Sequence, residues 1–183
     1  AGAAHDETGE GLRASRISRR EVFITTKVWQ THLSPPEFER STKESLARMR
    51  LSEVDLLLIH WPNPQIPLAE TIGALCKMKK MGFARHIGVS NFTVPMMREA
   101  VNLASEPLVT NQIEWHPYLD QSRLIAAVRA RGMAFVAYCP LGRGRMFSDP
   151  VLAEIAKARG RSIAQIALRW SVQQGIIPIP RSS

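Results

Sequence analysis

Short hydrophobic runs recur along the chain, and the run at residues 54–59 is interrupted only by Asp55 before His60 and Trp61 end it. A nearly continuous run of this length is typical of a strand buried on both faces, as in a parallel sheet covered by helices. Proteins built on such sheets place ligands and catalytic groups at the carboxyl ends of the strands. We therefore expect His60 to lie at the functional edge of a parallel sheet.

Five further runs predict strands, at residues 21–29, 85–91, 108–115, 133–139 and 176–181. Helices are predicted between them, at residues 35–50, 67–80, 93–103, 120–132, 149–160 and 162–175. Before the first strand, only residues 10–14 look helical. The strict alternation with short loops predicts a parallel sheet with right-handed crossovers, in a single domain spanning residues 1–183.

Cap residues stand where several of these helices should begin. Two segments read as capping boxes, in which a serine and a glutamate or glutamine three positions later satisfy each other's backbone amides. These are Ser34 with Glu37, where a proline also stands at the first helical position, and Ser162 with Gln165. Single caps are expected at Thr93, Asp120 and Asp149.

The composition is that of an ordinary globular protein, with 45% hydrophobic and 22% charged residues. No apolar run approaches the roughly 20 residues that a membrane span needs, and no signal peptide is visible. The two cysteines, Cys76 and Cys139, form neither a disulfide framework nor a spacing that suggests a metal site. A reducing cytoplasm is the simplest compartment.

The net charge of +8 raises the question of nucleic-acid binding. Lysines and arginines are spread over predicted helix faces and loop ends, and no recognition helix or basic-aromatic repeat is present. Most of this charge is therefore interpreted as solvated surface, and a phosphate-bearing small ligand is favoured over nucleic acid.

Each predicted strand has a polar residue at or near its carboxyl end: Lys27, His60, Asn91, Gln112, Tyr138 and Arg181. An open doubly wound sheet binds its ligand at one switch point, whereas every strand of a closed (β/α)8 barrel contributes to one site. Polar groups on all six strands therefore favour the barrel. The glycine-rich segment 140–145 and the basic end of the last strand fit a phosphate site near the last barrel strands. No G-x-G-x-x-G follows a strand, which disfavours a Rossmann site.

Five segments in order make the chain similar to the aldo-keto reductases, and most similar to their bacterial 2,5-diketo-D-gluconate reductase branch. The segments are residues 24–29 (ITTKVW), 58–62 (LIHWP), 87–92 (IGVSNF), 111–114 (NQIE) and 138–142 (YCPLG). They cover nearly the whole chain at the spacing of that family. The resemblance implies an α/β fold, the TIM barrel, and reduction of carbonyl groups with NADPH.

The resemblance also implies roles for single residues. Lys27 would be the catalytic lysine, which depresses the pKa of a tyrosine acid, and His60 would orient the substrate carbonyl. Trp29 and Trp61 would wall the substrate pocket. The remaining positions would bind NADPH: Ser90, Asn91 and Gln112 at the nicotinamide carboxamide, Tyr138 on the nicotinamide ring, Leu141, Gly142 and Arg143 at the pyrophosphate, and Arg181 with Ser182 at the 2′-phosphate.

Each of these positions also has an ordinary structural explanation. Lys27 could be a solvated lysine at a strand exit, and His60 could bond a loop. Ser90 and Asn91 could be turn or capping residues, and Gln112 could satisfy a backbone group in the core. The aromatic residues could belong to the core, the glycines to a tight loop, and the arginines to the surface. We favour the functional interpretation because one barrel predicts all these positions together.

The resemblance is incomplete at both ends. The family pattern has two further strands before Lys27, which carry an aspartate and the acid tyrosine in a Tyr-x-Asn-Glu segment, and a helix after Ser183. Residues 1–9 contain no tyrosine, and Asp6-Glu7 only faintly resembles that segment. Eight strand–helix units need about 250 residues, so the six predicted here would be the third to eighth strands of the barrel. Either the sequence is a fragment or mobile ends have been omitted from it; we favour the second, because a barrel without two strands exposes two edges.

Two functions of different classes remain. The first is NADPH-dependent reduction of aldehydes or ketones, either keto-sugar acids such as 2,5-diketo-D-gluconate or small aldehydes. The alternative is a non-catalytic, nucleotide-binding regulatory module of the same family, which the absent tyrosine would suit. A phosphate-substrate isomerase is disfavoured, because the strand ends carry no paired carboxylates. We expect a cytoplasmic monomer that binds a small carbonyl substrate and neither a membrane nor nucleic acid.

Overall fold

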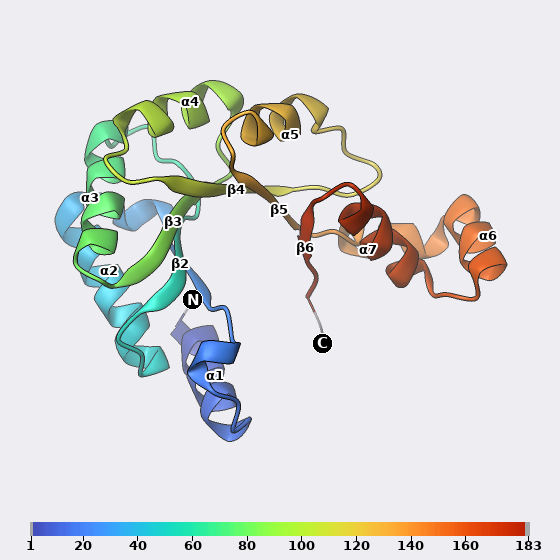
Figure 1. Cartoon of the computed structure of the whole chain (residues 1–183), viewed down its shortest axis with the longest axis horizontal. Helices are drawn as coiled ribbons and strands as arrows, with labels where there is room; N and C mark the ends of the chain where they lie inside the picture. The colour runs from blue at the N-terminus through green and yellow to red at the C-terminus, as the bar shows by residue number, and fades with distance from the viewer. Residues whose placement is uncertain (1, 182–183) are drawn as a thin grey trace. The chain divides into compact units, whose positions relative to one another are not determined.

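The computed structural model describes residues 2–181, with side chains from residue 4 onward. The chain forms two compact units, residues 1–109 and 110–183. Strands and helices alternate in both, and each strand pair within a unit is parallel, as the sequence pattern predicts (Figure 1). That the whole chain is one domain stays a prediction.

The first unit holds three complete strands with helices between them. Its elements are α1 (Gly2–Ala14), η1 (Arg19–Glu21), β1 (Thr25–Val28), η2 (Gln30–His32), α2 (Pro35–Met49), β2 (Val54–Ile59), α3 (Leu68–Lys80), β3 (Ala84–Ser90) and α4 (Val94–Leu103). Helix α1 packs on α2, α2 on α3, and α3 on α4. The strand order is β1-β2-β3, with β2 in the middle.

The second unit begins inside β4 (Leu108–Glu114). It continues with α5 (Ser122–Arg129), β5 (Ala134–Tyr138), η3 (Gly142–Ser148), α6 (Pro150–Arg159), α7 (Ile163–Gln173) and β6 (Ile177–Ile179). Strand β5 lies between β4 and β6. Helix α6 packs on α7, and α7 packs on β6.

Strand β2 has the burial that its hydrophobic run predicts. All six of its residues are buried, which requires cover on both faces of the strand. Strand β1 differs, because buried Thr26 and Val28 alternate with the more accessible Thr25 and Lys27. The side chain of Lys27 therefore lies on the opposite face of β1 from Val28.

Asp55 is a carboxylate inside this buried strand, and three groups compensate its charge. It accepts a 2.8 Å hydrogen bond from the backbone amide of Ile24, and its oxygens lie 2.8 Å from Arg19 and 3.4 Å from Arg85. Burial alone would raise the pKa of Asp55, but the Ile24 amide and the Arg19 guanidinium outweigh it and hold the pKa below its ordinary value. Asp55 thereby joins the segment before β1 to strand β3.

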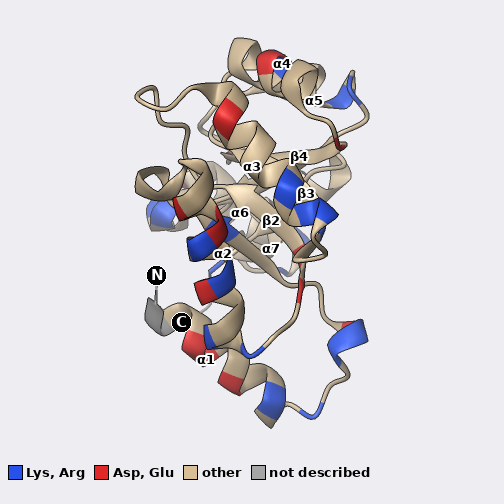
Figure 2. Ribbon diagram, turned by 90° about the vertical axis from the view of Figure 1, so that its left-hand side faces the viewer, with Lys and Arg blue, Asp and Glu red and all other residues tan. Residues whose placement is uncertain are grey.

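Charge on the helices of the first unit is mixed, as expected for a solvated surface. Acidic and basic residues both occur on α1 and α2 (Figure 2). On α2 the exposed Arg40 lies 2.5 Å from both Glu37 and Glu44, and Lys43 lies 2.6 Å from Glu39. None of the helices in residues 2–181 combines the length and apolar character that crossing a membrane requires.

Some of the predicted helix caps are present in the structure, and others are replaced by different contacts. Thr93 and Asp149 accept backbone amides at the starts of α4 and α6, and Ser162 with Gln165 forms a capping box. The capping box predicted at Ser34 is wrong, because the Glu37 carboxylate instead binds Arg40, with His32 at 3.4 Å. Asp120 bonds the Ser122 amide, but the helix begins two residues later than predicted.

Two boundaries near the amino end also differ from the prediction. Residues 21–24 do not extend β1, because Ser18 and Glu21 form a capping box around the short helix η1. Helix α1 extends from Gly2 to Ala14 rather than from 10 to 14. Its glycines made it look weak as a helix, but Gly9 is required by packing: a Cβ there would lie 2.7 Å from the Met49 carbonyl oxygen.

The Asp55 network gives a test of what holds the first unit together. Asp55→Asn should lower the free energy of unfolding by about 2–4 kcal/mol, because it leaves two guanidiniums near a neutral group. Since folding lowers the pKa of Asp55, its contribution is complete above the unfolded pKa of about 4 and is lost as the pH falls through the folded pKa. Urea unfolding at pH 7 and at pH 3 measures both effects.

Glu53→Gln is the matched control, because Glu53 binds the same Arg85 at 2.6 Å in a more exposed position. It should change stability little. Equal losses in the two variants would show that Asp55 has no special role.

Candidate active site

The carboxyl ends of β1, β2 and β3 lie at one edge of the first unit. The parallel register pairs Val28 with Ile59 and Ile59 with Val89. The residues that follow these positions are Trp29, His60 and Ser90. The structure therefore brings the first six predicted site residues to the same edge: Lys27, Trp29, His60, Trp61, Ser90 and Asn91.

Lys27 lies close enough to His60 for its charge to influence the ionisation of the imidazole. Burial lowers the pKa of the Lys27 ammonium. Burial also lowers the pKa of His60, and the positive charge of Lys27 adds to the effect. His60 is therefore neutral at pH 7. A neutral imidazole can donate one hydrogen bond and accept another. Among residues 4–181, no carboxylate forms an ion pair with Lys27.

Two tryptophans follow the ends of β1 and β2, one of them in ring contact with His60, and both remain accessible. The Trp29 and His60 rings meet edge to face with their centroids 4.8 Å apart. Trp29 and Trp61 are 42% and 41% exposed, so neither is a core aromatic. Exposed indoles beside a partly buried histidine and lysine form a suitable surface for a small polar organic molecule.

Ser90 and Asn91 end β3 beside the backbone of His60. Asn91 has a left-handed backbone with φ 62°, which asparagine tolerates better than most residues. Its side-chain amide donates to the His60 carbonyl oxygen at 2.9 Å and to the Ser90 hydroxyl at 3.2 Å. Asn91 thus holds the end of β2 in place, and its role toward a nicotinamide stays a prediction.

The second unit carries the other predicted residues at the ends of its strands. Gln112 on β4 is buried and pairs with Val136 of β5, while Tyr138 at the end of β5 is half-buried beside Glu114. Burial raises the pKa of the Tyr138 hydroxyl, and the Glu114 carboxylate raises it further. Tyr138 is therefore a neutral phenol at pH 7, and its role toward a nicotinamide stays a prediction.

The loop after β5 is wound tightly by left-handed residues. Positive φ angles occur at Cys139, Gly142, Arg143 and Gly144. The Gly142 amide donates to the Cys139 carbonyl oxygen at 2.9 Å, and the Gly144 amide donates to that of Leu141 at 3.0 Å. A Cβ on Gly142 would make only ordinary contacts, so conformation rather than space requires glycine there. Successive turns of this kind are suited to binding anions.

Glu114 lies beside the predicted site residues Tyr138 and Arg143, although no role was predicted for it. Its carboxylate lies 3.2 Å from the Arg143 guanidinium and 3.5 Å from the His116 ring. Arg143 also contacts the Cys139 side chain. The signal was present, since Glu114 directly follows the buried part of β4, but nothing in the sequence pairs it with an arginine 29 positions later.

The far end of the same loop is held by Tyr118. Its hydroxyl donates to Asp149 at 2.6 Å, and Asp149 also caps α6. The Arg145 guanidinium lies 5.8 Å from the centroid of the Tyr118 ring. The segment from Arg143 to Asp149 is thus attached at one end to Glu114, the last residue of β4, and at the other to Tyr118, which follows β4.

Arg181, predicted to read a 2′-phosphate, lies exposed two residues after β6. Its predicted partner Ser182 lies outside the described residues. The structure therefore collects the predicted residues at strand ends within each unit, while the individual roles assigned to them stay predictions.

Comparison with known proteins agrees with this geometry. The aldo/keto reductase family model matches residues 1–183. The chain is 38% identical to the methylglyoxal reductase DkgB of Yersinia pestis over 178 residues, which is 96% of this chain and 67% of that protein. It is also 38% identical to a glyoxal reductase of Bacillus subtilis, covering 95% of this chain and 63% of the relative. The chain thus spans about two thirds of the length of these relatives.

Solved structures give the same result. The crystal structure of a candidate 2,5-diketo-D-gluconic acid reductase B matches with a TM-score of 0.95 at 44% identity, covering 97% of this chain and 64% of that one. An aldo/keto reductase from Brucella melitensis matches with a TM-score of 0.90 at 34% identity, covering 97% of this chain and 69% of that one. The predicted fold class, part of a (β/α)8 barrel, is confirmed. The chain belongs to the aldo/keto reductase family of oxidoreductases.

Proposed function

We propose that the protein reduces the carbonyl group of a small aldehyde or keto-sugar acid with NADPH. The observation that carries the proposal is the pair formed by Lys27 and His60, a cation and a neutral imidazole at neighbouring strand ends. Burial lowers the pKa of both groups, and the exposed Trp29 and Trp61 lie at the same edge. Relatives named as methylglyoxal and glyoxal reductases support the reaction class. The neighbour named as a 2,5-diketo-D-gluconic acid reductase supports the keto-sugar alternative.

The chemistry of the donors fits NADPH. The left-handed loop at Gly142 and Gly144 carries Arg143, which suits a pyrophosphate. The half-buried neutral phenol of Tyr138 suits stacking on a nicotinamide, and Gln112, Ser90 and Asn91 offer hydrogen-bonding groups for its carboxamide. Leu141 would line the pyrophosphate, and Arg181 with Ser182 would receive the 2′-phosphate. When bound, NADPH supplies the hydride for the reduction.

The residues of this chain would orient and polarise the carbonyl. The neutral His60 imidazole can donate a hydrogen bond to the carbonyl oxygen and fix its direction. The Lys27 ammonium, partly shielded from water, stabilises negative charge that develops nearby and lowers the pKa of an acid that protonates this oxygen. The acid tyrosine of the family pattern is not among residues 1–9, so the proton donor is not assigned to a residue of this chain.

For the location and assembly of the protein, we propose a cytoplasmic monomer.

The first test concerns the ionisation of His60. Its pKa should lie below the ordinary 6.5, and an NMR titration of the imidazole signals measures it. In Lys27→Met the pKa should rise but remain below 6.5, because burial is the larger cause. Lys43→Met, which removes a lysine paired with Glu39 on α2, should leave it unchanged. An identical His60 pKa in wild type and Lys27→Met would mean that the two groups do not interact.

The second test separates catalysis from binding. In the full-length protein, Lys27→Met should lower kcat by about 10²–10⁴-fold, because the acid would lose the charge that lowers its pKa. NADPH affinity should change by no more than a few fold. His60→Ala should likewise reduce turnover far more than cofactor binding, and Lys43→Met should affect neither. Steady-state kinetics with methylglyoxal and fluorescence titration with NADPH give the two numbers. Turnover unchanged in Lys27→Met would make it an ordinary surface lysine.

The third test asks which arginine reads the 2′-phosphate. Wild type should prefer NADPH over NADH. Charge-assisted hydrogen bonds contribute about 1.5–3 kcal/mol each, so Arg181→Ala should weaken NADPH binding by roughly tenfold to a few hundredfold and hardly change that of NADH. Arg143→Ala should weaken both cofactors in parallel, because the pyrophosphate is common to them. A parallel loss in Arg181→Ala would show that Arg181 does not read the 2′-phosphate.

A further inference from the structure

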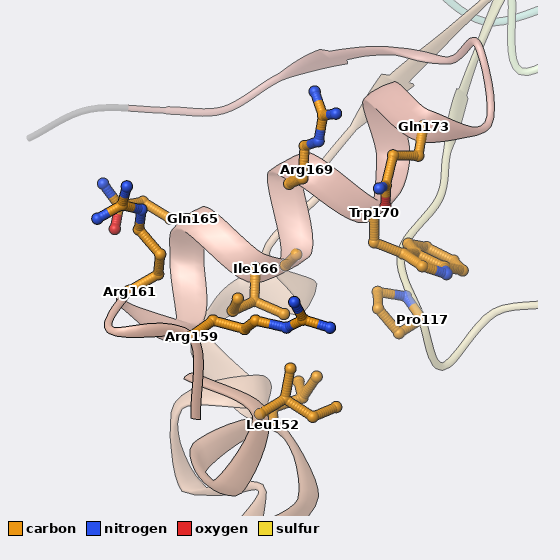
Figure 3. Close-up of a pocket in the computed structure, with 11 residues that line it drawn as sticks. Pro117, Leu152, Arg159, Arg161, Gln165, Ile166, Arg169, Trp170 and Gln173 are labelled. Carbon is orange, nitrogen blue, oxygen red and sulfur yellow. The ribbon is translucent and has the colours of Figure 1, made fainter. Parts of the chain in front are cut away.

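A groove between α6 and α7 lies apart from the residues assigned to the candidate site. Its volume is about 960 Å³, at the upper end of the roughly 300–1,000 Å³ typical of small-molecule sites. Leu152 of α6 and Ile166 of α7 lie on opposite sides of it, and Trp170 and Pro117 form one end (Figure 3). Most of the lining is apolar, as in binding sites for small organic molecules.

Trp170 is a wall that is fixed by packing. Its ring stacks on that of Trp115, with centroids 4.2 Å apart and planes within 6° of parallel. Trp115 is itself buried, and its ring meets Phe135 of β5 edge to face at 6.5 Å. A ligand that packs on Trp170 therefore does not have to order this side chain, which reduces the cost of binding.

The charged groups around the groove are all positive. Three arginines line it, Arg159, Arg161 and Arg169, and no aspartate or glutamate does. None of the three forms an ion pair with a residue in the described part of the chain. The Arg159 side chain extends across Ile166 toward Pro117 and Trp170, whereas the guanidiniums of Arg161 and Arg169 point away from the groove (Figure 3). One cation therefore faces the apolar surface, and the other two add a positive field around it.

We propose that this groove binds a small amphiphilic monoanion, an alkyl or aryl carboxylate. Its apolar body would lie on Trp170, Ile166 and Leu152, and its carboxylate would bind Arg159. A guanidinium offers two parallel donors to a carboxylate, which gives both strength and direction. A single inward-facing cation beside a mainly apolar lining fits an amphiphile better than a polyanion, which would need several cations along its length. The site does not depend on the cofactor.

Decanoate, with neutral decanol for comparison, tests the proposal on the protein labelled with ¹⁵N. The chain has four tryptophans, so the indole N–H signals distinguish this groove from the candidate active site, which holds Trp29 and Trp61. The Trp170 signal is assigned by its loss in Trp170→Phe. Decanoate should shift it saturably. Arg159→Gln should weaken the binding of decanoate by roughly tenfold or more, since the charge-assisted hydrogen bond is lost. The affinity for decanol should stay unchanged.

Arg169→Gln is the matched control, because it removes an equal charge whose guanidinium points away from the groove. It should change decanoate affinity by less than threefold. Ile166→Ala should weaken the binding of both decanoate and decanol, because both would pack on this side chain. The absence of a saturable Trp170 shift would overturn the proposal and is expected if a polypeptide segment already covers the groove. Equal weakening in Arg159→Gln and Arg169→Gln would also overturn it, because binding would then follow net charge. Neither result bears on the Lys27 and His60 tests.

Discussion

One buried carboxylate determines how the strands of the first unit are aligned. Asp55 accepts the Ile24 amide and faces Arg19 before β1 and Arg85 on β3. These contacts fix the register of three strands near their amino ends. Successive side chains of a strand point to opposite faces, so a slip of one residue would turn Lys27 away from His60. The placement of Lys27 and His60 at one end of the strands therefore depends on an ion-pair network at the other end.

The second unit relies on aromatic packing and on attachment of its longest loop. Trp115, the residue after β4, stands between Phe135 of β5 and Trp170 of α7, so one side chain links a sheet to a helix. Close to it, Glu114 and Tyr118 hold the two ends of the segment from Arg143 to Asp149. A strand end thus supplies both core packing and the polar contacts that shape the loop after β5.

Much of this architecture could be predicted from local patterns. The buried run of β2 and the Ser162–Gln165 capping box depend on near neighbours in sequence, and both are present. The errors arose where a distant or competing partner decided the outcome. Glu37 has the right spacing to cap with Ser34, yet binds Arg40. Gly9 weakens a helix intrinsically, yet allows α1 to approach Met49. The pairing of Glu114 with Arg143 could not be predicted, because single-sequence patterns do not specify which distant charges meet.

The ion pair between Glu114 and Arg143 has a consequence for selectivity among anions. A ligand that binds Arg143 must displace, or share the guanidinium with, a carboxylate already 3.2 Å away. Glu114 is thus a tethered competitor present at a high effective concentration. Chloride and other weakly bound monovalent ions gain too little from one exposed guanidinium to win this competition, whereas a diphosphate contacting several amides of the loop gains more. The loop would remain poorly occupied by the ordinary salts of a cell and would respond mainly to multiply charged ligands.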